Sequence, residues 1–225
     1  MCCCESGLNH SRAGWSTWPL LRRSKGGVSV LQAEDLATIR GERLVFSGLS
    51  FRVAAGGAML LTGPNGAGKS TLLRLLAGLG RLEAGRLLWG GADALEDLPA
   101  HAERVAYLGH LDAVKLGLTA AENLRAWAGR AAVAEALAVL GLTPLADLPA
   151  RLLSAGQRRR LALARLGLRA APLWLLDEPT LGLDAASVGR FGTMLARHRE
   201  NGGVVVAATH LPLPLPGADE LVLGA

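Results

Sequence analysis

Residues 58–71 read Ala-Met-Leu-Leu-Thr-Gly-Pro-Asn-Gly-Ala-Gly-Lys-Ser-Thr, and this stretch decides the fold. The continuous apolar run at 58–61 is typical of a buried strand in a parallel sheet. Leucines at 72, 73, 75, 76 and 79 follow at helical spacing. The order of strand, glycine-rich loop and helix predicts an α/β domain in which the loop holds an anion at the start of the helix.

The loop fits the phosphate-binding pattern Gly-x-x-x-x-Gly-Lys-Ser at 63–70. Glycines let backbone N–H groups converge on phosphate oxygens, which a side chain would hold away. We expect Lys69 to reach the β- and γ-phosphates and Ser70 to supply a hydroxyl to Mg²⁺. The predicted ATP-binding residues of this loop are Gly63, Pro64, Asn65, Gly66, Ala67, Gly68, Lys69, Ser70 and Thr71.

A second apolar run, Leu173–Leu176, ends in Asp177 and Glu178. An acid that follows a buried parallel strand lies at the carboxyl edge of the sheet, where the phosphate loop also lies. We therefore expect Asp177 to hold Mg²⁺ together with Ser70. Glu178 is predicted to polarise the attacking water.

The segment Leu153-Ser154-Ala155-Gly156-Gln157 opens a predicted helix that continues to Arg169. Ser154 is a plausible N-cap, so an ordinary helix start is one interpretation. The other is a second anion site, in which the helix start and Ser154 grip a γ-phosphate. If the surrounding helices hold this site away from the chain's own loop, it needs a second subunit.

These motifs occur in a fixed order, followed by Leu183-Asp184 and, after the apolar run 204–208, by Thr209-His210. In this order they resemble the ATP-binding-cassette (ABC) ATPases over about residues 28–225. The resemblance implies a P-loop NTPase domain with an antiparallel β subdomain and a helical subdomain at about 112–170. It also implies a homodimer in which Leu153, Ser154, Ala155, Gly156 and Gln157 contact the partner's ATP, with Asp184 at the dimer seam and His210 at the γ-phosphate.

Two positions depart from that family. An aromatic residue usually stacks on adenine about twenty residues before the loop, and Arg40 falls near that place. Its guanidinium could stack on the base instead. A glutamine usually follows the stretch that reads Val105-Ala106-Tyr107-Leu108-Gly109 here, but His110 and then Leu111 stand in its place. We expect His110 to take the glutamine's position.

Composition fits one large domain, because 50% of the 225 residues are hydrophobic and 19% are charged. The net charge of +5 comes mostly from arginines, which cluster only at 22–23 and 158–160. We expect these arginines to be solvated or to face a partner, and we expect no nucleic-acid partner. The three cysteines, at 2, 3 and 4, exclude a disulfide scaffold. Residues 1–27 are predicted to be a disordered or non-native extension.

Within the ABC family, the sequence resembles the ATPases of cytochrome c maturation exporters. This resemblance rests on 107–110, 118–124, 153–165 and 172–180, and especially on Ala155 before three arginines. It implies a peripheral ATPase on the cytoplasmic face of a bacterial inner membrane, paired with CcmB-like, CcmC-like and CcmD-like integral membrane subunits. It also implies that ATP hydrolysis powers release of a heme-loaded chaperone.

The heme is expected to belong to those partners, since the chain contains no CxxCH motif. His10, His101 and His198 are predicted to be surface histidines. Residues 112–151 are the candidate docking surface, with a solvated helical face as the alternative. An ATPase of a different exporter is an alternative interpretation. ATPases of DNA repair or translation usually carry two cassettes or a long coiled-coil insert, and this sequence shows neither. A non-hydrolysing regulatory subunit would need Glu178 or His210 to be missing, and both are present.

Overall fold

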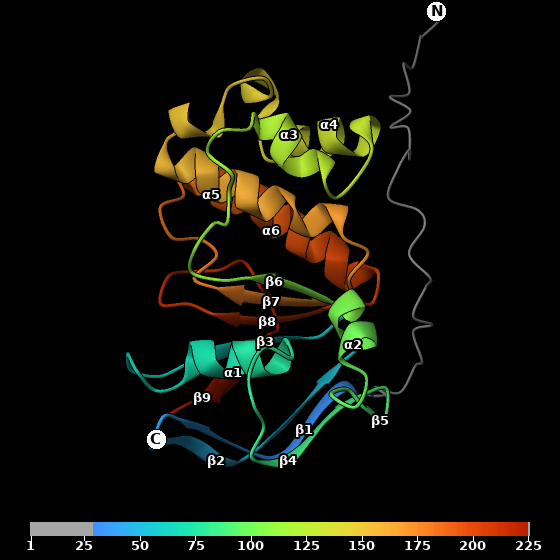
Figure 1. Cartoon of the computed structure of the whole chain (residues 1–225), viewed down its shortest axis with the longest axis vertical. Helices are drawn as coiled ribbons and strands as arrows, with labels where there is room; N and C mark the ends of the chain where they lie inside the picture. The colour runs from blue at the N-terminus through green and yellow to red at the C-terminus, as the bar shows by residue number, and fades with distance from the viewer. Residues whose placement is uncertain (1–28, 225) are drawn as a thin grey trace, which may run out of the picture.

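The computed structural model describes residues 29–224, which form two sheets and two layers of helices (Figure 1). A parallel sheet lies in the middle of the molecule. Helix α1 (Lys69–Leu76) and an antiparallel sheet cover one face of it, and helices α5 (Ala155–Ala164) and α6 (Ala185–Glu200) cover the other. The prediction for residues 1–27 lies outside the described residues.

The parallel sheet has the strand order β6-β7-β8-β3-β9. Three of its strands confirm the predicted apolar runs: β3 (Ala58–Thr62), β7 (Leu173–Asp177) and β8 (Val204–Ala208). The edge strands β6 (Val105–Leu108) and β9 (Asp219–Val222) were not predicted. β9 is mostly exposed, because it lies at an edge, and so it lacks the continuous apolar run of a central strand.

Successive side chains of the central strands point into two different cores, as the period of two requires. In β7, Leu173 and Leu175 pack with the leucines of α1, whereas Trp174 and Leu176 pack under the helices on the other face. β8 alternates in the same way. Burying a side chain of this size contributes about 1.5–3 kcal/mol, so both layers of the domain depend on the same two strands.

The antiparallel sheet has the order β2-β1-β4-β5. Its first two strands are long and pair antiparallel with each other. Its strands are β1 (Ser29–Arg40), β2 (Arg43–Ala54), β4 (Ala84–Trp89) and β5 (Ala92–Asp93). Register shifts interrupt the pairing of β1 with β2. Such irregularities interrupt the alternation of inward and outward side chains along a strand.

The remaining helices are short and lie mostly between β6 and β7. They are α2 (Leu98–Arg104), α3 (Ala120–Arg125) and α4 (Arg130–Val139), with 3₁₀ turns at Thr143–Leu145, Ala150–Leu152 and Leu166–Leu168. Thr119 and Glu122 form a reciprocal capping box at the start of α3. The boundaries of a helical subdomain at 112 and 170 stay a prediction. Within residues 29–224, no helix combines the length and apolarity needed to cross a membrane.

Candidate functional site

Three neighbouring parallel strands end at one cavity of about 680 Å³. β3 delivers the phosphate-binding loop, β7 delivers Asp177 and Glu178, and β8 leads into Thr209 and His210. Carboxyl ends of neighbouring parallel strands meet at one sheet edge, which is where ligands bind in folds of this kind. The cavity is lined by Arg40, Arg43, Val45, Asn65, Gly66, Ala67, Gly68, Lys69, Ser70, Thr71, Arg74, His110, Asp177, Glu178, His210 and Gly224.

Glycine is required at both ends of the phosphate loop. Gly63 has φ +125°, and a Cβ there would lie 2.1 Å from the carbonyl oxygen of Leu223, just after β9. Gly68 has φ +101° at the N-cap of α1, and its Cβ would lie 2.6 Å from Cγ1 of Val45. The loop therefore approaches both sheets too closely for any side chain at these two positions.

The ammonium of Lys69 points back across the loop. Its Nζ donates to the carbonyl oxygens of Gly63, at 2.6 Å, and Pro64, at 3.0 Å. The side chain is nearly buried, so these two carbonyls replace water around the charge. The cation is thus held at the loop where phosphates are expected to bind.

Glu178 is fixed by contacts from the end of β8. Its backbone N–H donates to the carbonyl oxygen of Ala208 at 2.8 Å. Thr209 Oγ1 and the backbone N–H of His210 donate to Glu178 Oε2 at 3.2 and 3.3 Å. The imidazole Nε2 of His210 lies 3.9 Å from Glu178 Oε1. The predicted pair of Glu178 and His210 is therefore brought together beside the cavity.

The backbone of Glu178 is in the left-handed region, with φ +47°. An L-residue is disfavoured there by roughly 1–2 kcal/mol. Such residues cluster at functional sites, where the surrounding contacts hold them in place. Asp177, by contrast, ends β7 in regular geometry and is almost completely buried.

The segment 153–157 and Asp184 are absent from the described lining of this cavity. Ser154 caps α5, and its hydroxyl accepts from the backbone N–H of Gln157 at 3.2 Å. Asp184 caps α6 and accepts from the N–H of Ser187 at 2.7 Å. Hydrogen bonds from Ser187 lower the pKa of Asp184. Within one chain, both segments are thus helix starts and not part of the site.

Arg40 and His110 line the cavity as predicted, but several other residues were missed. They are Arg43, Val45, Arg74, Thr209 and Gly224. Arg43 could have been found, because it pairs with Arg40 across the two-residue turn between β1 and β2. Arg74 in α1 and Thr209 beside His210 are close in sequence to predicted residues, whereas Val45 and Gly224 are brought in by elements distant in sequence.

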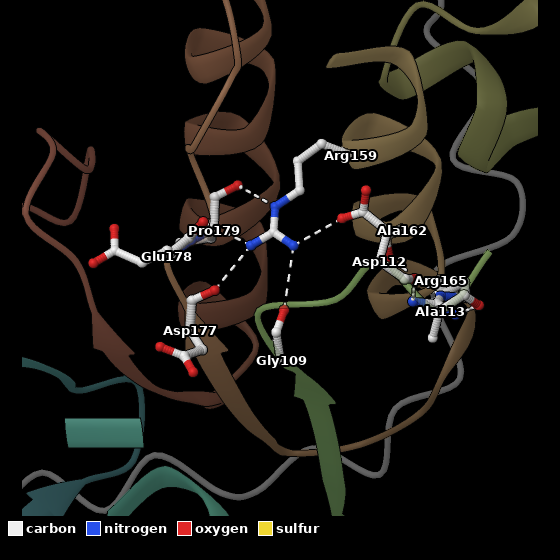
Figure 2. A network of polar contacts seen from close by, with 9 residues as sticks. All are labelled: Gly109, Asp112, Ala113, Arg159, Ala162, Arg165, Asp177, Glu178 and Pro179. Atoms are coloured by element: carbon white, nitrogen blue, oxygen red, sulfur yellow. Dashed lines mark hydrogen bonds and ion pairs between the residues drawn. The ribbon is translucent and has the colours of Figure 1, made fainter. Parts of the chain in front are cut away.

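The prediction that the arginines at 158–160 are solvated or partner-facing is wrong for Arg159. Its side chain is only 6% exposed and forms an ion pair with Asp112 at 2.9 Å. Figure 2 shows its guanidinium between the end of β7 and the segment after β6. Arg159 lies on the face of α5 that packs toward the sheet, and this position explains its burial.

The prediction that His101 and His198 are surface histidines is also wrong. The Nε2 of His101, in α2, lies 2.8 Å from the carbonyl oxygen of Leu76, and its side chain is fully buried. The ring of His198, in α6, stacks on Trp174 with centroids 3.9 Å apart. Both lie on the inner faces of their helices. His10 lies outside the described residues.

The fold and the site together define the ATP-binding subunit of an ABC transporter, and residues 46–181 match the family described as ABC transporter. A solved structure of an ATP binding subunit of an ABC transporter has the same fold, with a TM-score of 0.77, 23% identity, and coverage of 87% of this chain and 86% of that chain.

Curated relatives define the family more narrowly. The cytochrome c biogenesis ATP-binding export protein CcmA of Rhodospirillum rubrum is 54% identical, covering 87% of this chain and 86% of its own length. The protein of the same name from Paramagnetospirillum magneticum is 53% identical, covering 87% and 94%. The chain therefore belongs to the CcmA family of ABC ATPases.

Proposed function

We propose that this chain hydrolyses ATP for a membrane export complex of cytochrome c maturation and thereby powers release of a heme-loaded chaperone. One observation carries the ATPase assignment: Lys69, Asp177, Glu178 and His210 meet at a single cavity from three adjacent strand ends. The name of the relatives, cytochrome c biogenesis ATP-binding export protein, supports the choice of pathway. This name favours a role in cytochrome c maturation over a role in a different exporter.

The geometry of the cavity supports the following catalytic step. Lys69 and the amides of the phosphate loop bind the β- and γ-phosphates. Glu178, whose carboxylate Thr209 and His210 hold at the sheet edge, orients water for in-line attack. The half-exposed His210 imidazole lies beside that carboxylate, from where it stabilises charge on the γ-phosphate.

Ser70 and Asp177 fit a magnesium site, because both line the cavity and both offer the oxygen ligands that Mg²⁺ prefers. Among residues 29–224 there is no group of three or more His, Cys, Asp or Glu side chains placed to hold a metal ion. Two protein ligands completed by phosphate oxygens and water are typical of nucleotide-bound Mg²⁺. When bound, the ion neutralises charge on the transferred phosphate.

Two copies of the chain are proposed to enclose ATP between them. Ser154, Ala155 and Gly156 lie at the exposed or partly exposed start of α5 and outside the chain's own cavity. A helix start with unpaired N–H groups attracts anions. In a head-to-tail pair, this segment of one copy would contact the γ-phosphate bound by the other, with Asp184 beside the seam.

A groove of about 430 Å³ next to the site is the proposed docking place for the membrane subunits. Its lining includes Tyr107, Leu111, Trp127, Arg165 and Arg169. Leu111 is 81% exposed and Trp127 is 44% exposed, which is unusual for large apolar side chains outside an interface. The groove lies partly within the predicted surface 112–151.

In this proposal the partners are CcmB-like, CcmC-like and CcmD-like subunits, and the chain is peripheral on the cytoplasmic face of the bacterial inner membrane. Heme is held by the partners, and nucleic acid is no ligand. The chain's domain organisation is proposed to be one ABC ATPase domain over 28–225 that includes a helical subdomain at about 112–170. These features extend the ATPase assignment and are tested separately from it.

Glu178→Gln tests hydrolysis and the dimer together. The substitution keeps the hydrogen-bond acceptor toward Thr209 but removes the negative charge that polarises water. We expect phosphate release to fall by about 10²–10⁴-fold and the variant to form a dimer with Mg-ATP in size-exclusion chromatography with light scattering. Glu200→Gln, at the exposed end of α6, is the matched control. Unchanged phosphate release in Glu178→Gln would refute the catalytic assignment, and a monomer with ATP would refute the dimer.

Trp127→Ser tests docking to the membrane subunits. We expect this variant to hydrolyse ATP normally as a purified chain, to lose co-purification with a CcmB-like subunit and to fail in c-type cytochrome assembly. Leu79→Ser, at an exposed position outside the groove, is the control. Normal co-purification of the Trp127 variant would refute the groove as the docking place.

A further inference from the structure

Within the described residues 29–224, Arg159 is the one residue of α5 whose side chain contacts both the end of β7 and the segment Gly109–Ala113 (Figure 2). Its Nη2 donates to the carbonyl oxygens of Asp177, at 2.8 Å, and Glu178, at 2.6 Å. Its Nε donates to the carbonyl oxygen of Pro179 at 3.2 Å. One guanidinium therefore binds three consecutive carbonyls around the catalytic glutamate.

The same guanidinium holds the segment 109–113 through its other nitrogen. Nη1 donates to the carbonyl oxygen of Gly109 at 3.3 Å and to Oδ1 of Asp112 at 2.9 Å. Arg165, the C-cap residue of α5, donates to the backbone carbonyl oxygens of Asp112 and Ala113. The segment is thus fastened to α5 at both of its ends.

Two features make the Arg159–Asp112 ion pair the contact most able to change. Arg159 is 6% exposed, so its charge depends on a partner, whereas Asp112 is 28% exposed and can move into water. The segment also lines the docking groove, and His110 within it lines the nucleotide cavity as well. A ligand in the groove could therefore displace Asp112 without entering the nucleotide site.

A displacement at Asp112 would reach Glu178 because the guanidinium is planar and rigid. If Nη1 moves together with its acceptor, Nη2 and Nε move with it. They hold the carbonyls that flank the left-handed backbone of Glu178, a conformation that persists only while its surroundings impose it. The orientation of the Glu178 carboxylate toward water would change as a result.

We propose that Arg159 is a positioning residue for Glu178 and that its ion pair with Asp112 transmits movement of segment 109–113 to the rate of ATP hydrolysis. This inference rests on the proposed ATPase function. It assigns a role to a residue that contacts neither ATP nor the reacting water, and it links the groove to the site by a defined set of contacts.

The test uses Asp112→Ala and Asp112→Asn in the purified full chain, with Asp147→Asn, at an exposed position, as the matched control. We expect kcat for phosphate release to fall about tenfold in both Asp112 variants, which corresponds to about 1.4 kcal/mol. The KM for ATP should stay within about twofold of the wild type, since the phosphate loop is untouched. Thermal unfolding of each variant reports whether folding is preserved.

A double-mutant cycle then asks whether the effect passes through Glu178. In the Glu178→Gln background, Asp112→Ala should cause no further loss of residual turnover. The carboxylate whose orientation Asp112 is proposed to affect is already absent from that variant. Arg159→Lys should lower kcat similarly, since an ammonium cannot keep the planar set of contacts, and adding Asp112→Ala to it should change kcat less than twofold.

An unchanged kcat in Asp112→Ala would overturn the inference, as would an additive loss in the Glu178→Gln background or a rise in KM without a fall in kcat. If these results came with normal wild-type hydrolysis, the proposed function would stand. A wild-type chain that releases no phosphate would instead overturn the proposed function, and this inference with it.

Discussion

Acidification should destabilise this protein in part through one buried histidine, His198. Its ring stacks on Trp174 in β7, the strand that ends in the catalytic acids. Burial lowers the pKa of His198 from 6.5 to about 4, although hydrogen bonds to backbone carbonyls oppose the shift. The folded state therefore binds this proton more weakly than the unfolded state does.

The sign and size of the effect follow from linkage. The His198 contribution to stability is complete above about pH 6.5 and is lost as the pH falls from 6.5 toward 4. One pKa unit corresponds to about 1.4 kcal/mol, so the whole shift amounts to about 3 kcal/mol. Between pH 7 and pH 4.5, most of this loss takes place, about 2 kcal/mol.

The assay is urea unfolding followed by circular dichroism at pH 7 and pH 4.5. His198→Phe keeps a ring against Trp174 but removes the titrating group. The wild type should therefore lose about 2 kcal/mol more of its free energy of unfolding than the variant does on acidification. Effects of the carboxylates are common to both proteins and cancel in this difference.

His110→Phe, which replaces an exposed histidine, is the control for the exchange of a histidine for phenylalanine. The reasoning would be refuted if the wild type and His198→Phe lost the same free energy between the two pH values. It would also be refuted if the variant lost more than the wild type. Burial also lowers the pKa of His101. Because His101 is present in all three proteins, its contribution cancels in both comparisons.

Three further changes test the nucleotide site. Lys69→Ala should weaken ATP binding by about ten- to a hundredfold in isothermal titration calorimetry, because a charge-assisted hydrogen bond to phosphate is lost; binding within twofold of the wild type would contradict this. Gly63→Ala should lower the free energy of unfolding by about 1–3 kcal/mol in urea, since its Cβ would meet the Leu223 carbonyl at 2.1 Å, while Gly117→Ala, with open space around it, should have little effect. Arg40→Ala should raise the KM for ATP by about two- to fivefold if its guanidinium stacks on the base, and Arg40→Tyr should restore the wild-type value; an unchanged KM in Arg40→Ala would exclude stacking.

Much of the nucleotide site could be predicted because its parts are local in sequence. The phosphate loop, the acids after Leu176 and the residues after Ala208 each directly follow a buried apolar strand. A strand of a parallel sheet delivers its next residues to a known edge, so three local patterns predict one shared site. Arg40 and His110 also line this cavity, but both were located from the resemblance to ABC ATPases and not from a local strand pattern.

Other parts could not be predicted, because they depend on contacts between distant segments. Arg159 meets Asp112 across 47 positions of sequence, and Thr209 meets Glu178 across 31. His198 is buried because the inner face of α6 packs over β7, although its neighbours Arg197 and Arg199 are polar. A residue's type predicts exposure only on average, whereas the packing of its helix face decides it.

The order of strand, glycine loop and helix, together with the acids at the end of a later strand, thus specified a phosphate-binding α/β domain from short-range patterns alone. Packing then selected which polar side chains are buried and paired, and so joined Arg159 to the backbone of Glu178. The physical reason is that backbone geometry and hydrophobic period act over a few residues, whereas burial of a charge is settled only when separate elements close around it.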